Sequence, residues 1–193
     1  MLRRLYDWVM ALAGRRHAIW ALAGVSFAES AFFPIPPDVL LIPMVLADRR
    51  RAWRIAGVCT LASVLGGLLG YAIGLWLFDA VGQPLLEFYG SEEKFSQFQE
   101  YYNEWGGWIV GAGGFTPLPY KVITIASGVT RLDIGIFILA SVVARGLRFY
   151  IVAALLWRYG EPVRNFIERH LGKLALLFFV LLVGAFVLLK VLV

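Results

Sequence analysis

The chain has little of what a soluble or disulfide-stabilised protein needs. Its single cysteine, Cys59, excludes an intrachain disulfide, and its two histidines, His17 and His170, have no acidic or thiol neighbours at ligand spacing. Only 16% of the 193 residues are charged, against about 25% in a soluble domain, whereas 60% are hydrophobic. This composition excludes a soluble enzyme and a disordered chain, and it indicates an integral membrane protein.

The net charge of +5 comes from short clusters of Lys and Arg between apolar runs. That pattern is typical of topology signals and of contacts with anionic lipids, not of nucleic-acid binding. The sequence contains no metal-site pattern, no cofactor motif and no nucleophile–base pair. We therefore expect no enzymatic activity and no cofactor.

The hydropathy pattern predicts a single membrane domain that is made of segments of several kinds. Apolar runs of about 20 residues can span the ~30 Å of bilayer hydrocarbon, and we predict such helices at 55–80, 133–157 and 174–193. Two amphipathic segments are expected outside the hydrocarbon: 1–16 at the membrane surface, with a partly ordered tail as the alternative, and 84–105 on the external side.

Two further apolar segments, 18–47 and 106–129, are interrupted by prolines: Pro34, Pro36 and Pro37 in the first, Pro117 and Pro119 in the second. Proline lacks an N–H and cannot continue a helix. A broken backbone at membrane depth is tolerated only where protein buries it or where it lines a wet cavity. Both segments are therefore interpreted as re-entrant helical hairpins with the prolines at their tips.

Charge asymmetry gives the topology. Arg15 and Arg16 precede the first hairpin and Arg49–Arg51 follow it, so both flanks are expected in the cytoplasm. Residues 79–104 are acidic and are expected outside, and the second hairpin enters from there. The N-terminus is predicted to be cytoplasmic, in the bacterial inner membrane.

An internal repeat agrees with this topology. A shift of 83 residues places Phe32–Val39 over Phe115–Val122 and matches the Phe, both prolines and the Val. Each copy is a hairpin followed by a long helix, and the copies face opposite sides, as in the inverted repeats of transporters. The expected fold is all-α and polytopic, with a C-terminal transmembrane helix added. Gly66, Gly70 and Gly74 share one helix face and are expected to provide close internal packing.

Five ionisable residues lie inside apolar segments: Glu29, Asp38, Lys121, Arg145 and Arg148. Each costs roughly 2.5–3.5 kcal/mol when unpaired at mid-membrane, so such residues are usually functional. Arg145 and Arg148 share a helix face, and we expect them to meet the acids of the first hairpin around a wet cavity. Ion pairs that only lock the fold are the alternative. We predict that Glu29 carries a proton and that one arginine, Arg148, is free to bind phosphate.

The acids on a proline-broken hairpin, the second Pro-x-Pro hairpin and the arginine-bearing helix resemble the DedA family, whose VTT domain is shared with eukaryotic lipid scramblases. The resemblance covers about residues 20–160. It implies re-entrant hairpins in inverted repeat and movement of polyprenyl phosphate carriers or phospholipids between leaflets, with proton coupling in some members. It places the family's acids at Glu29 and Asp38, and its basic residues at Lys121 and at Arg145 or Arg148. Many members carry an arginine just before the second Pro-x-Pro, where this chain has Gly114–Thr116.

The predicted function is therefore the translocation of a lipid phosphate, with membrane lipids and protons as partners. Paired arginines suit a phosphate because the guanidinium fork can hold two of its oxygens. Two alternatives remain open: a proton-coupled transporter of an ion or small solute, and a membrane-integrity protein that transports nothing. The sequence does not specify the oligomeric state.

Overall fold

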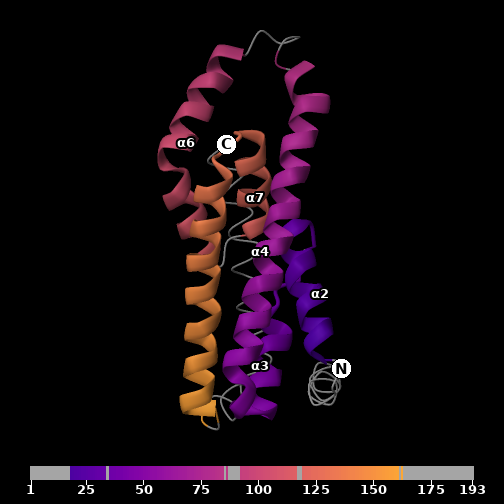
Figure 1. Ribbon diagram of the computed structural model, residues 1–193, viewed down its shortest axis with the longest axis vertical. Helices are drawn as coiled ribbons and strands as arrows, with labels where there is room; N and C mark the ends of the chain where they lie inside the picture. Colours follow the sequence, from indigo (N-terminus) through magenta and orange to yellow (C-terminus); the bar gives the residue numbers. More distant parts are fainter. Residues whose placement is uncertain are drawn as a thin grey trace.

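The computed structural model describes residues 18–33, 35–84, 86, 92–116, 119–160 and 162, which form helices joined by short turns, with no strand among them (Figure 1). The helices are α2 (Ala18–Ala31), α3 (Asp38–Ala47), α4 (Ala52–Leu77), α6 (Glu92–Phe115), α7 (Tyr120–Val129) and a last helix, Ile134–Gly160. The short turns η1 (Arg49–Arg51) and η2 (Phe78–Gly82, π-helical) flank α4. The helices expected at 1–16 and 174–193 lie outside the described residues. The all-helical prediction is confirmed.

Two helix–break–helix units occupy opposite halves of the molecule. Figure 1 shows α2 and α3 in one half and α6 and α7 in the other, with α4 running along both. The breaks fall at the proline clusters predicted from the sequence, and in each case a proline immediately precedes the second helix: Pro37 before α3 and Pro119 before α7. Proline fits there because the first turn of a helix leaves its N–H groups unpaired.

The helix boundaries follow the 83-residue spacing of the sequence repeat. Shifting α3 by 83 gives 121–130, and α7 is Tyr120–Val129; shifting α4 gives 135–160, and the last helix is Ile134–Gly160. In Figure 1, α4 and the last helix run in opposite directions. Corresponding helix boundaries thus fall within one residue of the 83-residue spacing.

One boundary differs from the prediction. Helix α6 runs without a break from Glu92 to Phe115, across the division expected at residue 105 between an external segment and a hairpin. Gly106 and Gly107 do not end the helix. A Cβ at Gly106 would overlap the side chain of Leu132, and one at Gly107 would lie 3.3 Å from Ile136. These glycines make room for the chain that follows α7. From the sequence alone, glycines that provide space for packing could not be distinguished from glycines that end a helix.

Helix α4 holds both units through its glycine face. A Cβ at Gly66 would overlap the Phe27 carbonyl of α2, and a Cβ at Gly74 would overlap the Ile125 carbonyl of α7. Gly70 lies between them, against Thr124. The prediction that this stripe serves internal packing is confirmed, since small residues let helix backbones approach closely.

The opposite face of α4 is apolar and exposed, with Leu61, Leu65 and Leu69 at four-residue spacing. Two helical runs, Arg49–Gly82 with 34 residues and Ile134–Gly160 with 27, are long and apolar enough to cross a membrane. They correspond to the spans predicted at 55–80 and 133–157. Exposed leucines in rows are typical of a surface that faces lipid.

The interior consists of two apolar clusters. One contains Leu22, Leu41, Cys59 and Phe149, among others, and the second contains Tyr102, Val110, Tyr120 and Phe137. Along the last helix, Arg145 lies between Phe137 of the second cluster and Phe149 of the first. The charged residues therefore occupy a polar layer between two apolar cores.

Candidate functional site

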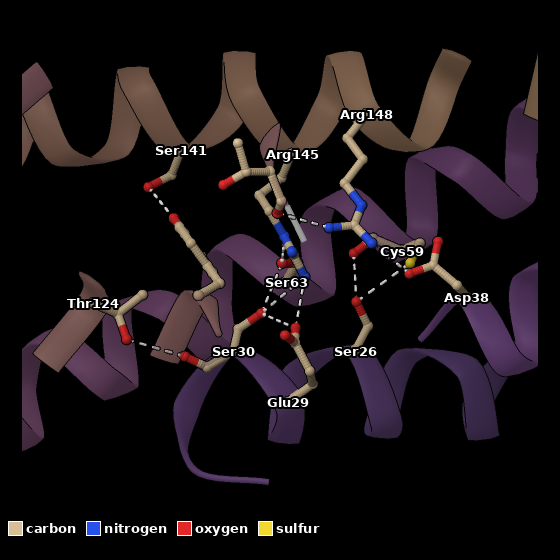
Figure 2. Close-up of polar contacts among 12 residues, drawn as sticks. Ser26, Glu29, Ser30, Asp38, Cys59, Ser63, Thr124, Ser141, Arg145 and Arg148 are labelled. Carbon is tan, nitrogen blue, oxygen red and sulfur yellow. Dashed lines mark hydrogen bonds and ion pairs between the residues drawn. The ribbon is translucent and has the colours of Figure 1, made fainter. Parts of the chain in front are cut away.

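The predicted site residues come from four helices, and four of the five meet. Glu29 lies in the last turn of α2, Asp38 is the first residue of α3, and Arg145 and Arg148 lie on the last helix. Both arginines pair with acids from the first broken unit (Figure 2). Lys121, near the start of α7, is half-buried and forms no ion pair with any residue that the structure describes.

Arg145 forms the more buried of the two pairs. Its Nη2 lies 2.6 Å from Oε2 of Glu29, and the two side chains are 2% and 13% exposed. The guanidinium carbon lies 4.8 Å from the ring centre of Tyr120 and 4.7 Å from that of Phe149, which places aromatic rings beside the cation. Ring faces attract cations most strongly where water is excluded.

Two serines complete the surroundings of Arg145 (Figure 2). Its Nε donates to Ser63 Oγ of α4 at 2.5 Å, and Ser63 Oγ lies 2.7 Å from Ser30 Oγ of α2. The Ser30 hydroxyl donates to the same Glu29 oxygen at 3.1 Å. The charged pair is therefore hydrogen-bonded on both sides, which a buried ion pair requires if it is to offset its desolvation.

Arg148 forms the more accessible pair and joins the two breaks. Its Nη2 donates to Asp38 Oδ2 at 2.7 Å, and both side chains are 20% exposed. Its Nη1 donates to the Thr116 carbonyl, just after the end of α6, at 3.1 Å. One guanidinium thus connects the first break, through a carboxylate, with the second break, through a backbone oxygen.

The prediction that Arg148 is free was wrong, since both arginines are paired with acids. The sequence argument assumed that a phosphate site needs an unpaired cation in the resting protein. Two acids and two arginines instead cancel in charge, which is the cheaper arrangement in an apolar environment. The expected meeting of the acidic hairpin with the basic helix is confirmed.

Sequence reading missed the hydroxyl groups of the polar layer. Besides Ser30 and Ser63, Thr124 donates to the Ser30 carbonyl at 3.1 Å, and the Tyr120 hydroxyl donates to Ser141 Oγ at 2.5 Å. A lone serine in an apolar run has no pattern of its own. One signal was available: Ser63 extends the small-residue face of Gly66, Gly70 and Gly74 by one turn.

Comparison with known proteins identifies the family of the chain. The VTT domain matches residues 35–158, about two thirds of the chain, including Asp38, Lys121 and both arginines. The chain belongs to the VTT-domain (DedA) family. The predicted resemblance is therefore confirmed, and this VTT-domain protein is a membrane protein.

Relatives of this VTT-domain protein come from bacteria and an archaeon. The chain is 36% identical over 186 residues to an uncharacterized protein of Haemophilus influenzae, covering 96% of each chain. It is 28% identical over 126 residues to the uncharacterized protein MJ0201 of Methanocaldococcus jannaschii, covering 64% of this chain and 74% of that one. It is also 28% identical over 126 residues to the uncharacterized membrane protein YkoX of Bacillus subtilis, covering 63% and 56% respectively. No solved structure matches the chain.

Proposed function

We propose that this VTT-domain protein moves a lipid phosphate, a polyprenyl phosphate carrier or a phospholipid, between the leaflets of the bacterial inner membrane. The observation that carries the proposal is the position of Arg148. Its guanidinium is partly exposed and holds an oxygen of each break, Asp38 Oδ2 and the Thr116 carbonyl. The cycle makes and breaks no covalent bond of the lipid, so the protein acts as a carrier and not as an enzyme.

A phosphate suits Arg148 because it offers the same kind of acceptors. The guanidinium fork already donates to two separate oxygens, and two phosphate oxygens would replace them without a new donor. Exchange needs Asp38 to withdraw. A proton taken up by Asp38 removes its negative charge and releases Arg148, which couples proton uptake to lipid binding. Lys121, near the start of α7, would supply a further positive charge.

The membrane arrangement follows from the repeat. We propose that α2–α3 enters from the cytoplasm and α6–α7 from outside, as re-entrant hairpins of an inverted repeat. The shared 83-residue spacing and the opposite directions of α4 and the last helix support this. The lipid head would cross at the polar layer while its tail stays in the bilayer. The Arg49–Arg51 end would then face the cytoplasm, as would the N-terminus.

The test is a leaflet-exchange assay in proteoliposomes that contain fluorescent polyprenyl phosphate or fluorescent phospholipid. We expect the wild type to transport at least one of the two, and Arg148→Lys to lose most of that activity with normal protein yield. Lysine keeps the charge but cannot hold two oxygens side by side. Arg131→Lys is the matched control, because Arg131 forms an exposed pair with Asp79 away from the breaks.

Three results would count against the proposal. Full activity in Arg148→Lys would exclude a two-oxygen phosphate contact. Exchange of neither lipid, together with proton-dependent uptake of a small solute, would favour a solute transporter. No transport of any kind, with a loss of membrane integrity on deletion, would favour a non-transport role.

Single cysteines in a Cys59→Ala background test the topology. Cysteines that replace Arg50 and Glu93 lie at opposite ends of the described structure. An impermeant reagent added to intact cells should label position 93 and spare position 50. The reverse result would overturn the proposed orientation.

A further inference from the structure

The Arg145 pair closes into a hydrogen-bonded ring with only one possible direction. A carboxylate only accepts and a guanidinium only donates. Ser30 has a single hydroxyl hydrogen and gives it to Glu29, so it must accept from Ser63. Ser63 in turn accepts from Arg145 Nε. The ring therefore runs from Arg145 through Ser63 and Ser30 to Glu29 and closes through Nη2 of Arg145 (Figure 2).

Both serines donate and accept a hydrogen bond in this ring, in a fully buried environment. Ser30 and Ser63 are fully buried, on α2 and α4 respectively. Hydrogen bonds that point in one direction polarise and strengthen one another, and a hydroxyl left unpaired at such a site is costly. The ring thus connects three helices: α2, α4 and the last helix.

We propose that Ser63 is a positioning residue that decides which arginine takes which acid. Arg145 and Arg148 are three residues apart on one face, so charge alone allows either of them to pair with Glu29. Within the described part of the chain, only Arg145 has a hydroxyl acceptor for its Nε, and Ser63 supplies it. With Glu29 committed to Arg145, Arg148 is left with Asp38 and the Thr116 carbonyl.

This division of roles rests on the lipid-phosphate function proposed above and deepens it. The ringed pair, Arg145 with Glu29, stays closed through the cycle. The accessible pair, Arg148 with Asp38, opens for proton and phosphate. Asp38 therefore replaces Glu29 as the acid expected to exchange a proton, because Glu29 is fixed by the guanidinium and by Ser30.

The first measurement does not depend on transport. In protein labelled with ¹⁵N-arginine, the Nε–H of Arg145, assigned by its loss in Arg145→Lys, should exchange slowly with solvent. Ser63→Ala should make that exchange at least about tenfold faster, the equivalent of one hydrogen bond to a charged group. Ser63→Thr, which keeps the hydroxyl, should restore protection. Ser30→Ala keeps the Nε acceptor and should give an intermediate rate.

Ser26→Ala is the matched control. Ser26 is also a fully buried serine of α2, and it donates to the Cys59 carbonyl of α4 at 2.8 Å, outside the ring. Its loss removes one buried hydrogen bond at the same helix contact and should leave the Arg145 Nε–H protected. Equal exchange rates in Ser63→Ala, Ser26→Ala and the wild type would overturn the positioning role.

The second measurement is lipid-phosphate exchange. Ser63→Ala should lower the rate about ten- to a hundredfold, with rescue by Ser63→Thr and no loss in Ser26→Ala. If the wild type transports no lipid phosphate, the proposed function fails while the exchange data still test the ring. If the wild type transports and Ser63→Ala transports equally well, the role of Ser63 fails and the function stands.

Discussion

Arg145 and Arg148 lie three residues apart on one helix, and each pairs with an acid of the first broken unit, yet their surroundings differ. The Arg145 side chain is 2% exposed and is enclosed by two hydroxyls and two aromatic rings, whereas that of Arg148 is 20% exposed and joins two chain breaks. The same residue type on the same face thus serves in a closed pair and in an accessible one. What separates them is the neighbouring helix: α4 supplies Ser63 to Arg145 only.

The largest expected effect is on folding. Arg145→Ala leaves Glu29 as a buried, unpaired carboxylate, and breaking a buried pair in this way costs about 3–5 kcal/mol of folding free energy. Arg148→Ala should cost clearly less, because Asp38 is less buried than Glu29. Denaturant titration of both variants in detergent measures the two losses. Equal losses of folding free energy would contradict the distinction between a closed and an accessible pair.

A smaller loss is expected from Gly66→Ala. The added methyl would overlap the Phe27 carbonyl, so α2 must shift and move Glu29 away from Arg145. Overpacking of this kind costs about 1–3 kcal/mol. Gly111→Ala, where a Cβ would meet nothing within 4 Å, is the control. The free energy of unfolding measures both, and equal values would contradict a tight contact at Gly66.

The smallest effect belongs to the exposed pair of Arg131 and Asp79. Their side chains are 53% and 48% exposed, and such pairs contribute about 0–1 kcal/mol. A double-mutant cycle with Arg131→Ala and Asp79→Ala should give a coupling in this range that falls further in high salt. A coupling free energy as large as that of Arg145 with Glu29 would show that burial does not determine the strength of these ion pairs.

The sequence was sufficient to locate the charged residues and the breaks. Charges inside apolar runs and prolines in clusters are rare enough to stand out, and both follow from the cost of burying them. The apolar run at 133–157 likewise predicted the last helix, Ile134–Gly160.

The sequence could not assign the pairs. Charge and helix periodicity leave either arginine able to meet either acid, and the choice depends on Ser63, a small polar residue without a distinguishing pattern. The same limit explains why the sequence wrongly predicted an unpaired Arg148. Its second acceptor is the backbone oxygen of Thr116, which any residue could supply. Contacts made by main-chain atoms and single hydroxyls become visible only when the helices are placed.

The glycine face of α4 has a mechanical consequence. At Gly66 and Gly74 the backbones of α2 and α7 touch α4 with no side-chain layer that could repack during a sliding motion. We therefore expect neither unit to travel along α4 as an elevator does. The last helix meets α4 through side chains and is the element that can tilt, about the Ser63–Arg145 hydrogen bond that stays closed. Transport in this protein should then proceed by tilting of the last helix against α2, α4 and α7, which move as one body.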